Sequence, residues 1–349
     1  MEDSSDKEKS LSEEAEEVEE IEQEESEWGI NYLDEKKTWD KYIIPEFCYQ
    51  PKICPTCQRK TFNIKENPKQ DILNPFIMRC SYGKCRRKKN IRSYSIFGLH
   101  KNLPGSVMLK IFQLFIIIKL NASQIYEKLA VTYKKKVSYI TVCKVLSNIR
   151  HIIADYLKYR YRVKQIGGDP SLKKNVAIDE SLYLKDDKGN KIWIVGAVDT
   201  DTKELRMDIM SNRNSSNLKI FITNHIIPGT NIIHDGWRGY AFLNSDDSVY
   251  TNEEYNHAHG NFGQGLHSTS HIESVWNSIK SEIKFLYRII PHSNYIYYLR
   301  ESEFRYIISK LSNTGKEKFF KKMLKICYDL NEYDFFDEDE LIDFNNYDY

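Results

Sequence analysis

Three short apolar segments follow one another in the second half of the chain: VAIDESLYL (residues 176–184), KIWIVGAVD (191–199) and ELRMDIM (204–210). Runs of this length, rich in β-branched residues and separated by turn residues such as Asp-Asp-Lys-Gly-Asn (186–190), predict β-strands. A helix is expected next, then a fourth strand, then two further helices, over 215–227, 230–235, 270–287 and 294–311. This order predicts an α/β domain with a mixed sheet.

The chain has 349 residues, of which 41% are hydrophobic and 29% are charged. That is enough for two or three folded modules. The net charge of +1 conceals a segregation, because residues 1–27 carry −12, residues 326–349 carry −9 and residues 28–325 carry +22. A body this basic favours a polyanionic partner such as nucleic acid. A lysine-rich surface that merely keeps the protein soluble is the alternative.

Composition changes divide the chain into five segments. Residues 1–27 are expected to be a disordered acidic tail, and 28–103 a cysteine-rich, basic module. A helical segment over 104–165 precedes the α/β domain over 172–312, and residues 313–349 are assigned to an acidic C-terminal tail. The N-terminus lacks a secretory signal, and the most apolar run (107–120) is too short to span a membrane. We therefore expect an intracellular protein without a membrane partner.

Apolar residues recur at helical spacing through the 104–165 segment, which predicts three short helices joined by tight turns. The recurring positions include Leu109, Phe112 and Phe115, then Ile125 and Leu129, then Val142, Val145 and Ile149. Such a trio is compatible with a DNA-binding helix-turn-helix. An ordinary helical linker bundle fits the pattern equally well.

Four of the seven cysteines form two close pairs, Cys54-Pro-Thr-Cys57 and Cys80-Ser-Tyr-Gly-Lys-Cys85, separated by 22 residues. Zinc takes four soft ligands in a tetrahedron, and two tight turns that each supply two thiolates satisfy it. We predict one structural zinc ion here, whose binding would add folding free energy of about 10 kcal/mol or more. Four incidental buried cysteines are the alternative.

A run of cations follows the last of these cysteines. It comprises Arg86, Arg87, Lys88 and Lys89, with Arg92 close behind. Fixed in place by the zinc site, these side chains would contact DNA phosphates. A solvated charged turn is the other interpretation.

Two aspartates stand where ligands gather in α/β sheets. Asp179 lies in an apolar strand, which we expect to end near it, and alternation places it on the face opposite Glu180. Asp235 ends the apolar strand Asn231-Ile-Ile-His-Asp235 and is followed at once by Gly236. The carboxyl ends of strands are where open α/β sheets bind ligands, so this placement suggests a shared site.

A third acid, Glu273, opens the helix that begins near Ser270. Lys280 lies seven residues later, on the same helix face, where its charge could steady a phosphate or orient the carboxylate. A structural role competes, because Ser270-x-x-Glu273 is also a capping box that would satisfy backbone donors. Two Asp and one Glu suffice to hold two Mg²⁺ (or Mn²⁺) ions, the arrangement that cleaves phosphodiesters with metals about 3.5–4 Å apart.

Five motifs in this order resemble the Merlin-type DDE transposases, eukaryotic relatives of a group of bacterial insertion-sequence transposases. They are Asp-Glu-Ser after an apolar strand, Trp193-Ile-Val-Gly-Ala-Val, Asp235-Gly-Trp-Arg-Gly-Tyr, Ile272-Glu-x-x-Trp-x-x-x-Lys280, and Tyr298-Leu-Arg-Glu-x-Glu-Phe-x-Arg-Tyr306. With the zinc ribbon, the resemblance covers roughly residues 50–310.

The resemblance implies an RNase H-like catalytic fold in which Asp179, Asp235 and Glu273 hold the two metal ions. It further implies cleavage at transposon ends and attack of the freed 3′-hydroxyl on target DNA, by a nuclear homodimer or higher oligomer bound to double-stranded DNA. The run His267-Ser-Thr-Ser-His271 departs from the family pattern, since it is one residue longer and lacks an Asn, which leaves the local register open. A domesticated DNA-binding protein and a stand-alone nuclease are the alternatives.

Overall fold

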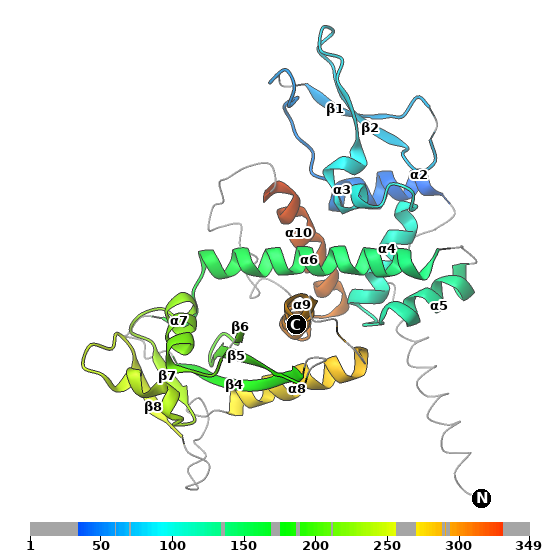
Figure 1. Cartoon of the computed structure of the whole chain (residues 1–349). Helices are drawn as coiled ribbons and strands as arrows, with labels where there is room; N and C mark the ends of the chain where they lie inside the picture. Colours follow the sequence, from blue (N-terminus) through cyan, green and yellow to red (C-terminus); the bar gives the residue numbers. More distant parts are fainter. Residues whose placement is uncertain are drawn as a thin grey trace, which may run out of the picture. The chain divides into compact units, whose positions relative to one another are not determined.

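The computed structural model describes residues 34–59, 61–69, 71–133, 137–168, 175–185, 189–210, 212–255, 270–287, 290 and 294–330. The chain forms two compact units (Figure 1). The first contains residues up to 119 together with the segment from 311, and the second runs from 120 to 310. The predicted acidic tail over 1–27 lies outside the described residues. Among the described helices, none combines the length and the apolar character that a membrane crossing requires.

The first unit is built on a small antiparallel sheet in the order β1-β2-β3. Its strands are β1 (Phe62–Glu66), β2 (Phe76–Cys80) and β3 (Lys88–Asn90). In the paired register, Phe62 lies opposite Cys80 and Met78 opposite Lys89. Alternate residues of β1 and β2 are buried, so one face of the sheet covers a core and the other is open.

Helices complete this core. They are α2 (Glu35–Thr38), η1 (Trp39–Ile43), α3 (Ile44–Phe47), η2 (Ile91–Tyr94), η3 (Ile96–Leu99), α4 (Gly105–Ile116) and α10 (Asn313–Leu330). Glu35 joins the first and later segments, because its carboxylate accepts hydrogen bonds from the Gly105 and Ser106 amides at the start of α4. A carboxylate at a helix N-terminus also complements the helix dipole.

Helix α10 differs from the sequence prediction, which placed all of 313–349 in an acidic tail. Residues 313–330 instead form a basic, amphipathic helix whose Phe319, Phe320, Met323 and Leu324 are buried. The Phe320 ring lies 5.5 Å from that of Phe112 in α4. Apolar side chains at helical spacing cause this segment to fold as a helix, and most of the acidic residues come after it.

The second unit has a five-stranded mixed sheet in the order β6-β5-β4-β7-β8. Its strands are β4 (Asn175–Lys185), β5 (Lys191–Asp199), β6 (Leu205–Met210), β7 (Asn231–His234) and β8 (Thr251–Glu254). The first three are antiparallel neighbours, whereas β7 pairs parallel to β4 and β8 parallel to β7. Three antiparallel strands followed by two parallel ones in this order form an RNase H-like sheet, as the sequence predicted.

Helices cover both faces of this sheet (Figure 1). Ala177 and Ile233 belong to a core with α8 (Ser270–Leu286) and α9 (Tyr295–Ile308). Val176 and Ile232, one residue earlier on each strand, belong to a second core with α7 (Ser215–His225) and η5 (Arg238–Asn244). The alternation of strand side chains therefore assigns α8 and α7 to opposite faces.

The predicted 104–165 segment is divided between the units. All three expected helices form, but α4 belongs to the first unit, whereas α5 (Ala122–Tyr133) and α6 (Tyr139–Val163) belong to the second. A buried ion pair joins α6 to α9, with Arg150 Nε 2.6 Å from Glu301 Oε2. Burial alone would raise the pKa of Glu301, but the charges of Arg150 and Arg305 outweigh it and lower that pKa.

Candidate functional site

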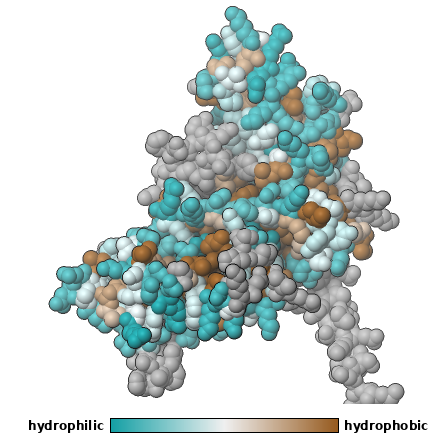
Figure 2. Space-filling model, viewed as in Figure 1, coloured by the Kyte–Doolittle hydropathy of each residue, from teal (hydrophilic) through white to brown (hydrophobic). Residues whose placement is uncertain are grey.

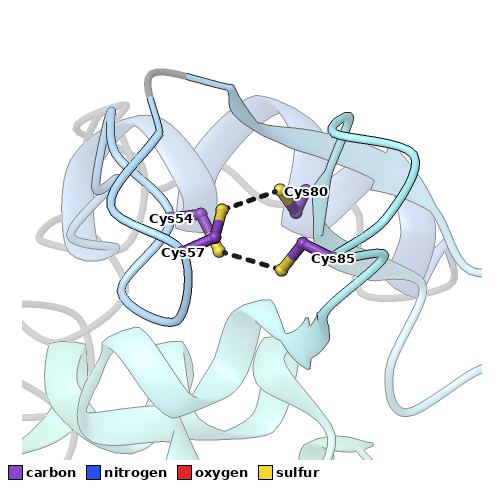
Figure 3. Close-up of side chains that lie close together, drawn as sticks. All are labelled: Cys54, Cys57, Cys80 and Cys85. Atoms are coloured by element: carbon purple, nitrogen blue, oxygen red, sulfur yellow. Dashed lines mark hydrogen bonds between the residues drawn. The ribbon is translucent and has the colours of Figure 1, made fainter.

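The four paired cysteines converge in the first unit (Figure 3). Their sulfur atoms all lie within 4.8 Å of one another. The Cys54 and Cys85 sulfurs are 3.9 Å apart, and those of Cys57 and Cys80 are 3.6 Å apart. Zinc–sulfur bonds of about 2.3 Å in a tetrahedron place sulfur atoms about 3.8 Å apart. The cluster therefore fits one tetrahedral zinc ion.

Both cysteine pairs are held by tight turns that end in a left-handed residue. In the first, the Gln58 amide donates to the Cys54 carbonyl at 2.8 Å, and Gln58 has φ of 57°. In the second, the Arg86 amide donates to the Tyr82 carbonyl at 3.1 Å, and Arg86 has φ of 49°. Non-glycine residues adopt this region at a cost of about 1–2 kcal/mol, so each turn stores some strain beside the cluster.

The cations after Cys85 do not all share one environment. Arg86, Arg87 and Lys88 are exposed, and Lys89 lies half-buried with its ammonium 4.4 Å from the centre of the Tyr94 ring. The first three are positioned as an exposed phosphate-contacting patch requires.

Arg92 differs from the predicted role of phosphate contact. Its side chain is only 2% exposed, and its guanidinium donates to backbone carbonyls of Leu73, Phe97, His100 and Leu103. Five donors in a fixed fork suit this task of joining loop carbonyls, because each buried carbonyl needs a partner. Arg92 therefore holds the loops of the first unit together and is turned away from any surface ligand.

In the second unit, Asp179 and Asp235 both lie just beyond the last paired residues of the parallel strands β4 and β7. Ala177 of β4 is paired with Ile233 of β7, the last residue of this register, and each aspartate stands two residues further on. Side chains two apart point to the same face, so both carboxylates face the α8 side. Strand β4 runs on to Lys185, so Asp179 lies within it and not at its end as the sequence suggested.

The Asp179 carboxylate is held by a side chain from α8. The indole Nε1 of Trp276 donates to Asp179 Oδ2 at 2.9 Å. Burial raises the pKa of Asp179 to about 7, with smaller increases from the charges of Glu180 and Asp235. The indole donor opposes this rise, since it stabilises the charged form. Burial favours the protonated form of Asp179, and a bound cation would stabilise the charged form instead.

A glycine makes the Trp276 contact possible. Gly196 of β5 lies directly opposite Asp179 in the sheet. A Cβ atom at Gly196 would lie 2.4 Å from the Trp276 ring and 3.3 Å from Ile272. The missing side chain therefore lets α8 approach the sheet at the level of Asp179.

The residues that follow Asp235 fix the orientation of its carboxylate. Its Oδ1 accepts the Trp237 amide at 2.9 Å, and the Gly236 amide donates to His234 Nδ1 at 3.1 Å. Gly236 has φ of +76°, and a Cβ there would lie 2.1 Å from the Glu254 carboxylate. This position thus requires glycine for both its backbone conformation and its space.

Glu180 is a neighbouring acid that the sequence did not single out as functional. It projects to the opposite face, where its oxygens accept from the Tyr240 hydroxyl at 2.5 Å and from Arg213 at 2.9 Å. Burial raises its pKa, while Tyr240 and Arg213 oppose the rise. The Arg213 guanidinium also lies over the Trp237 ring at 4.7 Å. Glu180 thereby ties β4 to the loop that carries Asp235, and the adjacent pair Asp179-Glu180 was the only signal of it in the sequence.

Glu273 and Lys280 lie on α8, and both side chains are exposed. Trp276, which contacts Asp179, is one turn beyond Glu273 on the same helix, so the helix that carries the third acid reaches the site of the first. The capping-box interpretation stays open, and residues 267–269 of the divergent run lie outside the described residues.

The three acids do not form a cluster as tight as the cysteines. Among the described residues, only these four cysteines bring three or more possible metal-ligand atoms within 4.8 Å of one another. A two-metal site does not demand such a spacing, because acids on different ions can lie up to about 8 Å apart when the ions are about 4 Å apart. The donor set, oxygen only, is the one that Mg²⁺ prefers.

The fold and these two aspartates of the β4-β7 pair define an RNase H-like domain with a candidate carboxylate site. Residues 166–306 of the chain, which include Asp179, Asp235 and Glu273, match the family described as the ISXO2-like transposase domain. The match supports placing this segment in the class of DDE transposase domains. No curated protein matches the chain in sequence.

Solved structures with similarity to the chain include integrases and a transposase. The HTLV-2 integrase catalytic core domain in complex with magnesium has 12% identity and a TM-score of 0.26, over 38% of this chain and 83% of that one. A simian T-cell lymphotropic virus intasome in complex with PP2A regulatory subunit B56 gamma has 11% identity and a TM-score of 0.27, over 58% and 69%. The Mos1 transposase paired-end complex with left transposon end has 11% identity and a TM-score of 0.25, over 64% and 76%.

Proposed function

We propose that this protein is a DDE transposase of the Merlin type, which cleaves DNA at transposon ends and joins the freed 3′-hydroxyl to target DNA. The proposal is carried by one observation. Asp179 and Asp235 each follow a paired residue of β4 and β7 by two positions, and Trp276 of the Glu273 helix hydrogen-bonds to Asp179. The match of residues 166–306 to a transposase domain supports the same assignment.

In this proposal, Asp179, Asp235 and Glu273 hold two Mg²⁺ or Mn²⁺ ions, which supply activation of the attacking oxygen and stabilisation of the leaving oxygen. Asp235 immediately follows the adjacent strand β7, and Trp276 of α8 donates to Asp179. The indole fixes the orientation of the Asp179 carboxylate, and the Trp237 amide fixes that of Asp235. Lys280, two turns after Glu273, would contact a DNA phosphate.

The first unit supplies DNA binding in this proposal. The four cysteines hold one structural zinc ion, and the exposed Arg86, Arg87 and Lys88, with the half-buried Lys89, contact the phosphate backbone. Joining two transposon ends in one complex requires two active sites, so we propose a homodimer or higher oligomer. A protein that acts on chromosomal DNA of a eukaryotic cell would work in the nucleus.

The test is a cleavage assay on a duplex that carries the inverted repeat flanking the reading frame in its genome. The wild type should cleave this duplex with Mg²⁺ or Mn²⁺, and Asp235→Asn should lose cleavage by at least a hundredfold while it retains binding. Asp246→Asn removes an exposed carboxylate of the same unit and serves as the matched control. Full cleavage by Asp235→Asn would exclude the assignment. Binding without cleavage by the wild type would favour a domesticated DNA-binding protein.

Cation binding can be measured separately from cleavage. Trp276 contacts Asp179 directly, so Mn²⁺ binding at Asp179 should change the fluorescence of the indole. The change should be absent in Trp276→Phe and in Asp179→Asn. A signal that persists in Asp179→Asn would place the cation elsewhere.

A further inference from the structure

The open face of the β1-β2-β3 sheet carries a set of side chains of which the proposed function uses only Lys88. Asn63, Arg79 and Lys88 form one row across the three strands, and Lys65, Ile77 and Asn90 form the row two residues away. These six share a face because side chains alternate along each strand. The opposite face holds buried residues, among them Phe62, Met78 and Cys80.

The open face is basic and has no carboxylate in its two rows. Lys65, Arg79 and Lys88 are all exposed, and none of them makes a salt bridge to another described residue. Between residues 59 and 92 the sequence has 11 basic residues and two acidic ones, Glu66 and Asp71. Glu66 points to the other face and pairs with Lys36 at 2.8 Å, and Asp71 accepts from Asn74 at 2.6 Å. The cations of the open face therefore have no internal counter-charge among these residues.

Arg79 and Lys88 stand directly opposite each other on β2 and β3. Neighbouring strands are about 4.8 Å apart, so two like charges here repel and destabilise the pair. Nothing in the described part of the unit offsets this repulsion. A polyanion laid across the strands would remove it and release counter-ions from its own phosphates.

Further cations lie along the β3 edge of the sheet. A shallow hollow of about 200 Å³ beside β3 is lined by residues that include Lys69, Lys88 and Lys89. Arg86 and Arg87, both exposed, immediately precede β3. In Figure 2 much of the visible surface over β1 and β2 is hydrophilic, which is the character of a phosphate-contacting surface and not of a protein–protein core.

We propose that this face, defined by Asn63, Lys65, Arg79 and Lys88, binds the phosphate backbone of double-stranded DNA. Its two rows contain no aromatic residue, whereas surfaces that bind single strands stack bases on aromatic rings. The absence of stacking side chains favours a duplex over single-stranded DNA or RNA. The proposal rests on the DNA-binding part of the proposed function, but it does not depend on cleavage.

The experiment measures the affinity of the full-length, zinc-loaded protein for a 30-base-pair duplex of random sequence, by fluorescence anisotropy at several salt concentrations. Arg79→Gln combined with Lys88→Gln removes two contacts. We expect affinity at low salt to fall about tenfold or more and the slope of log affinity against log salt to decrease by about 2. Lys52→Gln combined with Lys101→Gln is the matched control, because it removes two exposed cations of the same unit outside the sheet.

Zinc content should be measured on every variant and should stay at one ion per chain. That result shows that the module is folded. An unchanged affinity and salt slope in the Arg79/Lys88 variant would overturn the proposal, as would an equal loss in the Lys52/Lys101 control. Tighter binding to single-stranded RNA than to the duplex would also overturn it. Because the assay needs no cleavage, a protein that binds duplex through this face but never cuts it would refute the transposase assignment alone.

Discussion

Replacing Asp179 by asparagine should stabilise the protein while abolishing the metal-dependent cleavage that we propose for it. Burial raises the pKa of Asp179 from 3.8 to about 7, so the folded protein holds a proton there more tightly than the unfolded chain does. The stability that this carboxyl contributes is present at low pH and is lost as the pH rises from about 4 to 7. Asparagine has no charge to bury and can still accept the Trp276 hydrogen bond.

The magnitude follows from the shift. A rise of about 3 pKa units corresponds to about 4 kcal/mol, at 1.36 kcal/mol per unit. The Trp276 hydrogen bond is stronger to a carboxylate than to an amide oxygen, which offsets part of this gain. We therefore expect Asp179→Asn to be more stable than the wild type by about 2–4 kcal/mol at pH 8 without divalent cations, and the two proteins to converge near pH 4.

The assay is urea unfolding followed by circular dichroism, in EDTA, at pH 5 and pH 8, with Asp246→Asn as the control for loss of an exposed carboxylate. Saturating Mg²⁺ should stabilise the wild type and leave Asp179→Asn unchanged, because ligands stabilise the state that binds them. A stability difference that is the same at both pH values would refute the reasoning. A variant no more stable than the wild type at pH 8 would refute it too.

Three further outcomes are expected. Gly196→Ala places a Cβ 2.4 Å from the Trp276 ring and should cost about 1–3 kcal/mol of stability in urea unfolding; an unchanged midpoint would mean that the indole is not confined there. Burial lowers the pKa of His225 from 6.5 to about 4, so wild-type stability should fall by up to about 3 kcal/mol as the pH drops from 7 to 4, and His225→Leu should flatten that slope in the same titration. Cys57→Ser should release zinc in a metal analysis and lower the melting temperature, whereas Cys143→Ser, outside the cluster, should retain one ion. Equal zinc content in both would remove the cluster as the binding site.

The first three strands of the second unit and the cysteine cluster of the first unit could be predicted because their signals are local. Strand alternation and turn residues identify β4, β5 and β6, and cysteine spacing identifies the zinc cluster. Contacts between distant residues leave no such pattern. Trp276 and Asp179 are 97 residues apart, and neither segment has a sequence pattern that predicts their hydrogen bond.

Charge was the least reliable guide to the role of a single residue. Arg92 belongs to a cationic run by composition, yet it is buried, with its guanidinium bonded to four loop carbonyls and lying over the Trp39 ring. Arg92 lies in the short helix η2, just after β3, and the transition between these two elements directs its side chain inward, which the charge of the run does not indicate. Charge also misled at α10, because the acidic composition of residues 326–349 was extended back over residues 313–325, which are basic and amphipathic.

The close approach of α8 to β5 also bears on how this protein can change over evolutionary time. Gly196 can accept a larger residue only if position 276 has first become smaller, and a smaller residue at 276 leaves Asp179 without its donor. Each first step is therefore disfavoured, so the two positions form a pair in which neither mutates alone. Among related sequences we expect glycine at 196 and tryptophan at 276 to be retained or lost together. Under the proposed function, lineages in which both are lost should be those in which DNA cleavage has also been lost.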